Sequence, residues 1–338
     1  MAKITNEKEA LAAVRKNGLA LENVPEALIT VEICLAALHA EKFAINYVPA
    51  KIKEAVLKAY TNITTEEEAL AFVKESGNLE FVPKNLRTVE VCFEALRQWQ
   101  NGKALADVPK KIMTEGLCIA AIESDGEAIQ FVNEKFITEE LCRSAVMNNP
   151  MALQYVPKKF RTNDVCLTAV REYGMALEYV PDNLKTEEIC LIAVQEWSER
   201  IALEFVPESL KTPELCLIAV NNCSHQATLN FVPEVLRTEE LCLIAVKRHG
   251  LALQFVPEAL KTKELCLTAV KRYSGALRYV PEALKTKGLC LDAVKKNGYL
   301  LQYVPEELKT EKLCQAAVMR NREAVEYVPD ALRKKWNK

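Results

Sequence analysis

The 338-residue sequence predicts an all-α solenoid of about thirteen helical-hairpin repeats, each about 24 residues long. Three observations predict this fold. The dipeptide Val-Pro recurs at spacings of mostly 24 or 26 residues, a threonine follows the proline by five residues in eleven units, and the motif Leu-Cys-Leu-x-Ala-Val comes next. The repeat prolines are Pro25, Pro49, Pro83, Pro109, Pro157, Pro181, Pro207, Pro233, Pro257, Pro281, Pro305 and Pro329, with Asn133 in place of one more. A fixed period of this length is typical of stacked units rather than of two globular domains.

The first element of each unit is predicted to be a long helix of about 12 residues. Its threonine is an N-cap, because the hydroxyl can accept a hydrogen bond from a free N–H group of the first turn. Glutamates often follow, as at residues 238–240 (Thr-Glu-Glu), and favour the positive end of the helix dipole. Residues 241–246 (Leu-Cys-Leu-Ile-Ala-Val) form an apolar stripe of helical period. Pairs such as 173–174 (Tyr-Gly) and 297–298 (Asn-Gly) predict a left-handed C-cap.

The second element is predicted to be a shorter helix of about six residues. It has the pattern Ala-Leu-x-aromatic-Val-Pro, as in residues 252–257. Proline ends a helix at or before the preceding residue and can open a new turn, so the residues after it form a one-turn link to the next threonine cap. Alternation with a period of two is not found, and no strand is predicted.

The combined pattern resembles a bacterial repeat family known as a domain of unknown function. The shared motif is Ala-Val-(Lys/Arg)-x-x-Gly-x-Ala-Leu-x-(Tyr/Phe)-Val-Pro, and the resemblance covers residues 4–332. Members are found in effector-type and uncharacterised proteins. The resemblance implies a helical repeat fold but supplies no activity, catalytic residue or ligand.

One irregularity suggests a division of the chain. Ten extra residues lie between Pro49 and Pro83, and residues 51–60 predict a helix without the cysteine or the threonine cap. We therefore expect N-terminal repeats over residues 1–62 and a main array over residues 63–338.

Composition excludes several classes of protein. Half of the residues are hydrophobic and 27% are charged, which is too apolar for a disordered chain. Apolar runs stay well short of the roughly 18 residues that a spanning helix requires, and the first residues lack the apolar region of a secretory signal. We expect a cytoplasmic protein without membrane association, with delivery to another cell as an effector left open, and with reduced cysteines.

The twelve cysteines are predicted to be structural. Eleven lie nine residues after a repeat proline or after Asn133, at Cys34, Cys92, Cys118, Cys142, Cys166, Cys190, Cys216, Cys242, Cys266, Cys290 and Cys314. Equivalent atoms of stacked helices lie about 9–10 Å apart, which is too far for a disulfide. No C-x-x-C motif or histidine spacing indicates a metal site, and no cofactor is predicted. Cys223 alone leaves this column and falls on a predicted loop.

Two columns of aromatic residues have different interpretations. The column two residues before the proline is almost invariant, which indicates packing. The column sixteen residues after the proline varies. Its large side chains are candidate interface anchors, with local covering of the hairpin loop as the alternative. These candidates are Trp99, Tyr173, Trp197, His249 and Tyr273.

Charge divides the sequence unevenly. Residues 1–246 carry 25 basic and 36 acidic side chains (net −11), whereas residues 247–338 carry 19 basic and 10 acidic ones (net +9). Basic pairs recur in register at Lys247-Arg248, Lys271-Arg272 and Lys295-Lys296. Cations near helix C-termini also match the dipole, so the alternatives are a solvated face, an acidic protein surface or nucleic acid.

These observations favour a non-enzymatic scaffold that binds a protein partner as an adaptor, effector or inhibitor. The alternative is a nucleic-acid binder that uses the basic C-terminal repeats over residues 247–338. An enzyme with a site assembled across repeats is a third hypothesis, although the three histidines lie in no catalytic motif.

Overall fold

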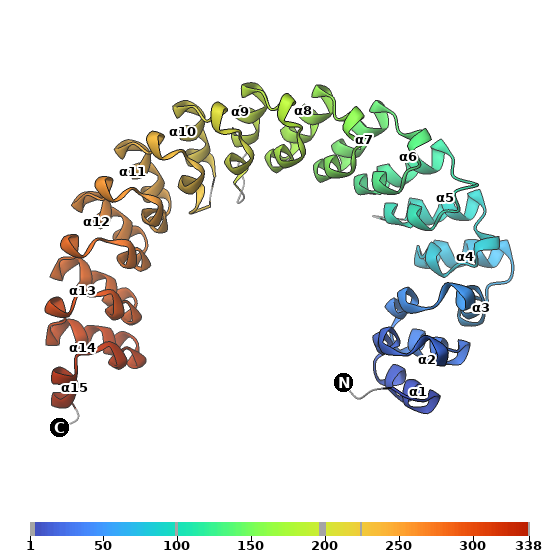
Figure 1. Ribbon diagram of the computed structural model, residues 1–338, viewed down its shortest axis with the longest axis horizontal. Coiled ribbons are helices and arrows are strands. Elements are labelled where there is room, and N and C mark those ends of the chain that lie inside the picture. The colour runs from blue at the N-terminus through green and yellow to red at the C-terminus, as the bar shows by residue number, and fades with distance from the viewer. Residues whose placement is uncertain (1–3, 99–100, 196–200, 224, 337–338) are drawn as a thin grey trace. The chain divides into compact units, whose positions relative to one another are not determined.

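A computed structural model describes residues 4–98, 101–195, 201–223 and 225–336, and these residues form α-helices and 3-10 helices without any strand (Figure 1). The all-α repeat prediction is confirmed. The chain divides into two compact units, residues 1–160 and 161–338, which are described separately. The predicted division after residue 62 falls inside the first unit and stays a prediction.

Each unit is built around one α-helix per repeat, and these helices are mostly ten residues long rather than twelve. The first unit contains α1 (Glu7–Lys16), α2 (Val31–Ala40), α3 (Ala50–Thr61), α4 (Glu66–Ser76), α5 (Val89–Arg97), α6 (Glu115–Ser124) and α7 (Glu139–Asn148). The second unit contains α8 (Asn163–Glu172), α9 (Glu187–Gln195), α10 (Pro213–Asn222), α11 (Glu239–Arg248), α12 (Lys263–Arg272), α13 (Lys287–Lys296), α14 (Glu311–Arg320) and α15 (Asp330–Trp336).

The shorter predicted helix is present, but it is a 3-10 helix of three to six residues. In the first unit these short helices are η1 (Gly18–Asn23), η3 (Lys42–Tyr47), η4 (Leu79–Phe81), η6 (Gly102–Asp107), η7 (Gly126–Phe131) and η9 (Pro150–Tyr155). In the second unit they are η11 (Gly174–Tyr179), η13 (Ala202–Phe205), η15 (Thr228–Phe231), η17 (Gly250–Phe255), η19 (Ser274–Tyr279), η21 (Gly298–Tyr303) and η23 (Arg322–Tyr327).

A three-residue 3-10 turn follows most repeat prolines, as the one-turn link predicts. These turns are η2 (Glu26–Leu28), η5 (Lys84–Leu86), η8 (Glu134–Phe136), η10 (Lys158–Phe160), η12 (Asp182–Leu184), η14 (Glu208–Leu210), η16 (Glu234–Leu236), η18 (Glu258–Leu260), η20 (Glu282–Leu284) and η22 (Glu306–Leu308).

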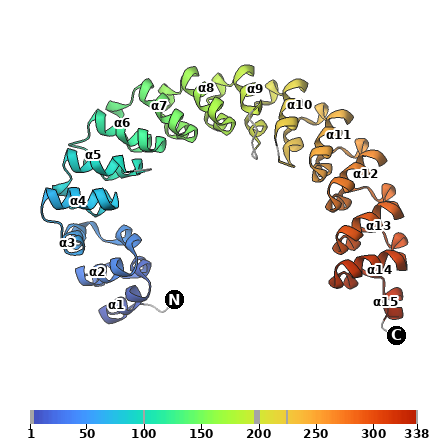
Figure 2. The ribbon, with the colours of Figure 1, turned by 180° about the vertical axis from the view of Figure 1, so that it is seen from behind.

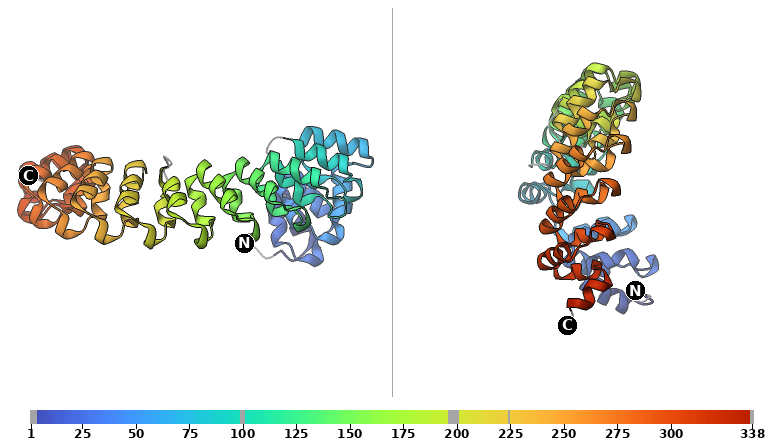
Figure 3. Two further views of the ribbon diagram at one scale, coloured as in Figure 1. Left: turned by 90° about the horizontal axis from the view of Figure 1, so that it is seen from above. Right: turned by 90° about the vertical axis from the view of Figure 1, so that its left-hand side faces the viewer.

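Within each unit the helices stack in chain order. In the second unit, α8 to α14 pack each against the next, and the short helices η11 to η23 form a second layer alongside (Figure 1, Figure 2 and Figure 3). The core lies between the two layers. In the repeat of α11, the long helix buries Leu241, Cys242, Ala245 and Val246, and η17 buries Leu253 against them.

The threonine caps are confirmed almost throughout. In ten of the eleven predicted positions, the threonine hydroxyl accepts a hydrogen bond of 3.1–3.4 Å from the N–H group three residues later. Thr310 makes no such bond. Thr65 adds a capping box with Glu68, so the irregular segment uses the same device to begin α4.

The left-handed C-cap predicted for the glycine pairs is wrong. Tyr173 and Asn297 are extended, with φ of −155° and −148°, and the glycines after them open the short helices. A Cβ added to Gly174 would lie 2.2 Å from the carbonyl oxygen of Ala193 in the next long helix. Glycine is therefore needed here because two backbones approach closely. Among the described residues, positive φ occurs only at Asn62 and Gly77, which end α3 and α4.

This close approach predicts opposite effects for two glycine-to-alanine substitutions in the second unit. Gly174→Ala should lower the free energy of unfolding by about 2 kcal/mol, because the new methyl group forces the two backbones apart. Ser274 fills the same position in another repeat, so we expect destabilisation and not misfolding. Gly288→Ala should raise stability by about 0.5–1 kcal/mol, because nothing lies within 4 Å of its added Cβ in α13. Urea denaturation measures the free energy of unfolding of both variants. Equal changes would contradict the conclusion that close backbone approach requires glycine at residue 174.

Candidate functional site

The cysteine column is part of the core, as predicted. All eleven side chains are fully buried, and all are free thiols. Burial raises the pKa of most of them to about 11, as for Cys166, Cys190 and Cys242. A buried thiol with a raised pKa is a poor nucleophile and a poor metal ligand. In the described ranges, no group of three or more His, Cys, Asp or Glu side chains is placed to hold a metal ion.

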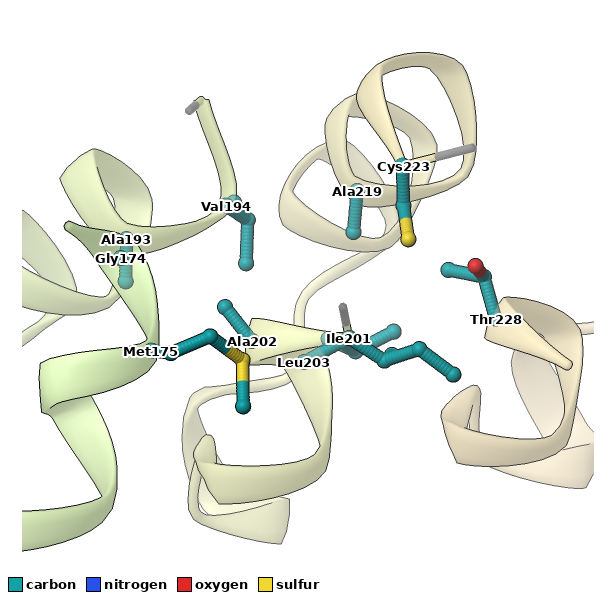
Figure 4. A pocket seen from close by; sticks show the side chains of 10 residues that line it. All are labelled: Gly174, Met175, Ala193, Val194, Ile201, Ala202, Leu203, Ala219, Cys223 and Thr228. Carbon is teal, nitrogen blue, oxygen red and sulfur yellow. The ribbon is translucent and has the colours of Figure 1, made fainter. Parts of the chain in front are cut away.

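Cys223 lies outside the helices, in agreement with the predicted loop, but it is buried too. It directly follows α10, is 8% exposed, and its sulfur accepts a hydrogen bond from the His225 N–H group. The side chain borders a small void among Met175, Ile201 and Thr228 (Figure 4). The void measures about 10 Å³, which is at most the volume for one water molecule. This place is therefore an imperfection of packing rather than a ligand pocket.

The first aromatic column lies at the boundary of the core: its rings are mostly half-buried, and Tyr47 packs against the buried cluster of the first repeats. Only Phe81 is buried, Tyr155 is exposed, and the others are half-buried. In most repeats the valine after the aromatic residue and the leucine or isoleucine two positions before it are buried, as are Val256 and Leu253 around Phe255. The 3-10 turn places each ring at the edge of the short-helix layer.

The second aromatic column has a definite place in the repeat. Each of its residues links the long helix to the short helix. We call this side of the stack the loop edge. It consists of the last residue of each long helix, the linking residue and the first two residues of the short helix. In four repeats, asparagine or aspartate at this linking position caps the short helix by accepting a hydrogen bond of 3.0–3.1 Å from its second N–H group, whereas Asn321 makes no such bond. The capping residues are Asn17, Asp125, Asn149 and Asn297.

Three of the predicted anchors occupy the linking position without capping. Tyr173, His249 and Tyr273 make no side-chain cap hydrogen bond. Tyr273 is 54% exposed, while Tyr173 and His249 are half-buried. The other two anchors, Trp99 and Trp197, lie outside the described residues.

The basic pairs divide into two roles. The first members, Lys247, Lys271 and Lys295, are exposed in the last turns of α11, α12 and α13. In two of the three pairs, the second member caps the preceding long helix. Arg272 Nε donates to the Arg248 carbonyl (3.1 Å), and Lys296 Nζ donates to the Lys271 carbonyl (3.0 Å). Asn222 and Asn148 do the same in other repeats, so part of the basic stripe is structural.

Sequence reasoning missed a column of inward-facing cations, which we call the tie residues, four positions after the repeat proline. In the basic third, Lys261, Lys285 and Lys309 pair with the glutamate three residues before (2.5–2.6 Å). Arg87 is 7% exposed and donates to the carbonyls of Val82 (2.9 Å), Asp107 (2.6 Å) and Glu80 (3.0 Å). The tie residues are Arg87, Arg161, Lys185, Lys211, Arg237, Lys261, Lys285, Lys309 and Arg333. Most of these cations are themselves largely buried, whereas the carboxylates that pair with the lysines are exposed.

A second feature that sequence reasoning missed is an apolar row on the long helices. The residue after the cysteine is partly or fully exposed, as at Phe93, Ile119, Leu217 and Leu267. The sequence did contain a signal for this row. The residue lies two positions after the buried first leucine of Leu-Cys-Leu, and this spacing corresponds to 200° of helical rotation, which places it on the opposite side of the helix.

The structure brings four of the predicted residues together in one hollow. Arg248, His249, Arg272 and Tyr273 line a space of about 340 Å³ between the ends of α11 and α12. Gln226, Gly250 and Leu251 also line it, and among the residues that the structure describes the lining includes no carboxylate. Burial lowers the pKa of His249, and the positive charges of Arg248, Arg272 and His225 lower it further. The remaining predicted residues, Tyr173, Lys247, Lys271, Lys295 and Lys296, do not line this hollow.

The first unit has a hollow of opposite character at the same edge. It measures about 470 Å³, and its lining includes Asp125, Glu127, Asn148 and Asn149. Carboxylate and amide oxygens therefore dominate there, whereas donor groups dominate around His249. The two hollows provide an internal comparison of the same backbone with different side chains.

Comparisons with known proteins agree with the repeat pattern. Among the described residues, no helix combines the length and the apolar character needed to cross a membrane. A search of the curated proteins gives no match. A family model described as a domain of unknown function, DUF4116, matches residues 115–161, 162–211, 212–261, 238–285 and 286–333. Since these matches cover more than half of the chain, the protein belongs to the DUF4116 family.

Proposed function

We propose that this chain is a non-enzymatic scaffold that binds a protein partner through the loop edge of its second unit. An adaptor, an effector and an inhibitor would all use such a surface. The observation that carries the proposal is the loss of the cap at Tyr173, His249 and Tyr273. A side-chain cap contributes about 1 kcal/mol, so each ring replaces a stabilising contact without making another of the same kind.

Exposure and charge support a role in binding. Tyrosine is enriched at binding hot spots because it combines a large apolar area with a hydroxyl group, and Tyr273 is exposed. The exposed lysines Lys247 and Lys271 lie in the last turns of α11 and α12 and add positive charge to the same edge. Positive charge around an apolar anchor favours an acidic partner surface.

Affinity capture tests the proposal with a double variant, Tyr173→Asn with Tyr273→Asn. Asparagine at this position caps the short helix in other repeats, so the double variant should keep or increase its melting temperature. It should nevertheless lose the proteins that the immobilised wild-type chain captures from a nuclease-treated native lysate, as identified by mass spectrometry. The matched control is Val235→Asn, which changes an exposed apolar residue in the proline turn η16 and should leave capture intact.

Two outcomes would contradict the proposal. In one, the double variant captures the same proteins in the same amounts as the wild type. In the other, capture depends on nucleic acid and disappears after nuclease treatment. That second outcome would favour the basic repeats as a phosphate-binding surface instead.

A further inference from the structure

The stack of long helices in the first unit is interrupted after α3, which follows α2 in the stack (Figure 1). Asn62 ends α3 in the left-handed conformation, and Thr65 caps α4 only three residues later. Within the described residues, every other long helix from α1 to α14 is followed by a short 3-10 helix. Helices α1 to α3 pack each against the next, as do α4 to α7, but no comparable packing joins α3 to α4. The layer of short helices therefore lacks one member at this place.

The interruption leaves a hollow of about 330 Å³ at the loop edge. Part of its lining comes from the ends of α2 and α3 and from the first residue of η3, which contribute His39, Tyr60 and Lys42. The rest comes from α4 and η4, which contribute Phe72 and Phe81 among others. Pockets that hold small molecules usually measure roughly 300–1,000 Å³, so this hollow has room for one small molecule.

Aromatic rings form the apolar part of the lining. The Tyr60 ring contacts two others, with centroid distances of 5.2 Å to His39 and 5.7 Å to Phe81. Phe81 is buried and belongs to the core cluster of the first repeats, and the half-buried Tyr60 and Phe72 pack against that cluster. The core thus holds these rings in place while they also border the hollow. Aromatic rings attract a further planar ring in offset or edge-to-face contacts.

The polar groups of the lining are suited to an anion. The hydroxyl groups of Thr61 and Ser76 donate back to carbonyls of their own helices (2.9 Å and 2.7 Å), so both already have an acceptor. Lys42 is exposed and makes no ion pair within the described ranges. In the same part of the chain, no carboxylate lines the hollow. One cation without a lining anion favours a ligand with a negative charge.

We propose that this hollow binds one small aromatic acid, whose planar ring packs against Tyr60, Phe72 and Phe81 and whose carboxylate lies beside Lys42. The ring supplies apolar contacts where the layer of short helices is interrupted, and the carboxylate stays at the exposed rim. The site lies in the first unit, so it is independent of the partner surface proposed for the second unit.

NMR of the full chain tests this site, because the sequence contains only three histidines. Labelling of histidine at ¹³Cε1 gives three signals, and the variants His225→Gln and His249→Gln assign two of them without touching the hollow. The probe is indole-3-acetate, and indole and acetate represent its two halves. Indole-3-acetate should shift the His39 signal until it saturates, because the ring bound beside Tyr60 changes the local magnetic field. The signals of His225 and His249 should stay in place.

The contribution of charge is tested at Lys42. Indole-3-acetate should bind the wild type about fivefold more tightly than indole, which is the upper range for an exposed ion pair. Lys42→Gln should remove this difference by weakening the binding of indole-3-acetate alone, since indole makes no ionic contact. The matched control is Lys58→Gln, which removes an exposed lysine from the last turn of α3 that does not line the hollow. It should leave both affinities unchanged.

The contribution of the rings is tested at Tyr60. Tyr60→Leu should weaken the binding of both indole-3-acetate and indole by at least about tenfold, because it removes a ring from the lining. The matched control is Tyr47→Leu, since Tyr47 packs against the same core cluster but does not line the hollow. Both variants should lower the melting temperature, and only Tyr60→Leu should lower the affinities. Because Lys42 is exposed, its variant decides the question even if Tyr60→Leu does not fold.

Four results would overturn the inference. The His39 signal does not move with indole-3-acetate, or it moves together with those of His225 and His249. Acetate alone produces the same shift, which would indicate a site for charge without the ring. Indole and indole-3-acetate bind the wild type equally well, which would indicate an apolar hollow without preference for an acid. Finally, the affinity of Tyr60→Leu equals that of Tyr47→Leu, which would place the probe elsewhere on the chain.

Discussion

Raising the pH from 8 to 11 should unfold the helical repeats, because the eleven column cysteines hold their protons only while they are buried. Burial raises the pKa of nine of these thiols from 9.0 to about 11 or 12, and raises that of Cys266 and Cys314 in the same direction. The folded chain therefore binds these protons more tightly than the unfolded chain. The resulting stability is complete below pH 9 and is lost as the pH rises towards 11.

The size of the effect follows from the number of repeats. One pKa unit corresponds to about 1.4 kcal/mol, so each thiol contributes about 1 kcal/mol less at pH 10 than at pH 8. Nine such thiols together lose on the order of 10 kcal/mol, which is comparable with the whole free energy of unfolding of a typical domain. A single buried cysteine would hardly affect alkaline stability, whereas a repeated one dominates it.

Urea denaturation at pH 8, 9 and 10 under reducing conditions measures this loss as a slope. The triple variant Cys190→Ala, Cys216→Ala and Cys242→Ala should reduce the loss of stability between pH 8 and pH 10 by about 3 kcal/mol, or about 1.5 kcal/mol per pH unit, whatever its cost in packing at pH 8. Tyr155→Phe with Tyr273→Phe removes two exposed phenols and should leave the slope unchanged. An equal slope for the triple variant and the wild type would show that the thiols are not the groups that titrate.

The fold could be predicted because each repeat contains the same short sequence signals. Threonine caps, the apolar stripe and Val-Pro each act over a few residues, and thirteen copies remove the ambiguity of one. The predicted left-handed C-cap at the glycine pairs was wrong for a physical reason. Gly174 has the sequence context of a left-handed cap, but the contact that requires glycine is made with Ala193, nineteen residues away in the next repeat. Propensity rules do not register contacts between repeats.

The candidate site was predictable only in part. The sequence identified His249, Tyr273 and the basic pairs as candidate binding residues. It did not show that Arg272 reaches the end of α11, because that contact depends on how far one repeat is rotated against the next. Counting charges in the sequence also overestimated the positive charge at the surface, since Lys261, Lys285 and Lys309 turn inward as tie residues. The sequence shows which repeats differ at a given position, whereas only the packing shows which of these residues come into contact.

Replacing the tie residue Arg87 should cause one of the largest losses of stability for a single substitution. Arg87→Met removes three charge-assisted hydrogen bonds and leaves the carbonyls of Val82, Asp107 and Glu80 without this donor. Methionine fits the space, because Met113 holds the equivalent position in the following repeat and is buried there. The cost is therefore that of the lost bonds, about 4 kcal/mol rather than the sum of three full desolvation penalties.

A graded series separates hydrogen bonding from charge at this position. Arg87→Lys should cost about 2 kcal/mol, because an ammonium group can keep one bond to the next repeat, as Lys285 Nζ does to the Tyr303 carbonyl (2.7 Å). The control Lys84→Met removes an exposed cation from the same turn, η5, and should change stability by less than about 0.5 kcal/mol. Urea denaturation at pH 7 orders the three variants. Equal stability of Arg87→Met and Lys84→Met would mean that the tie residues do not join neighbouring repeats, and that apolar contacts alone hold the first unit together.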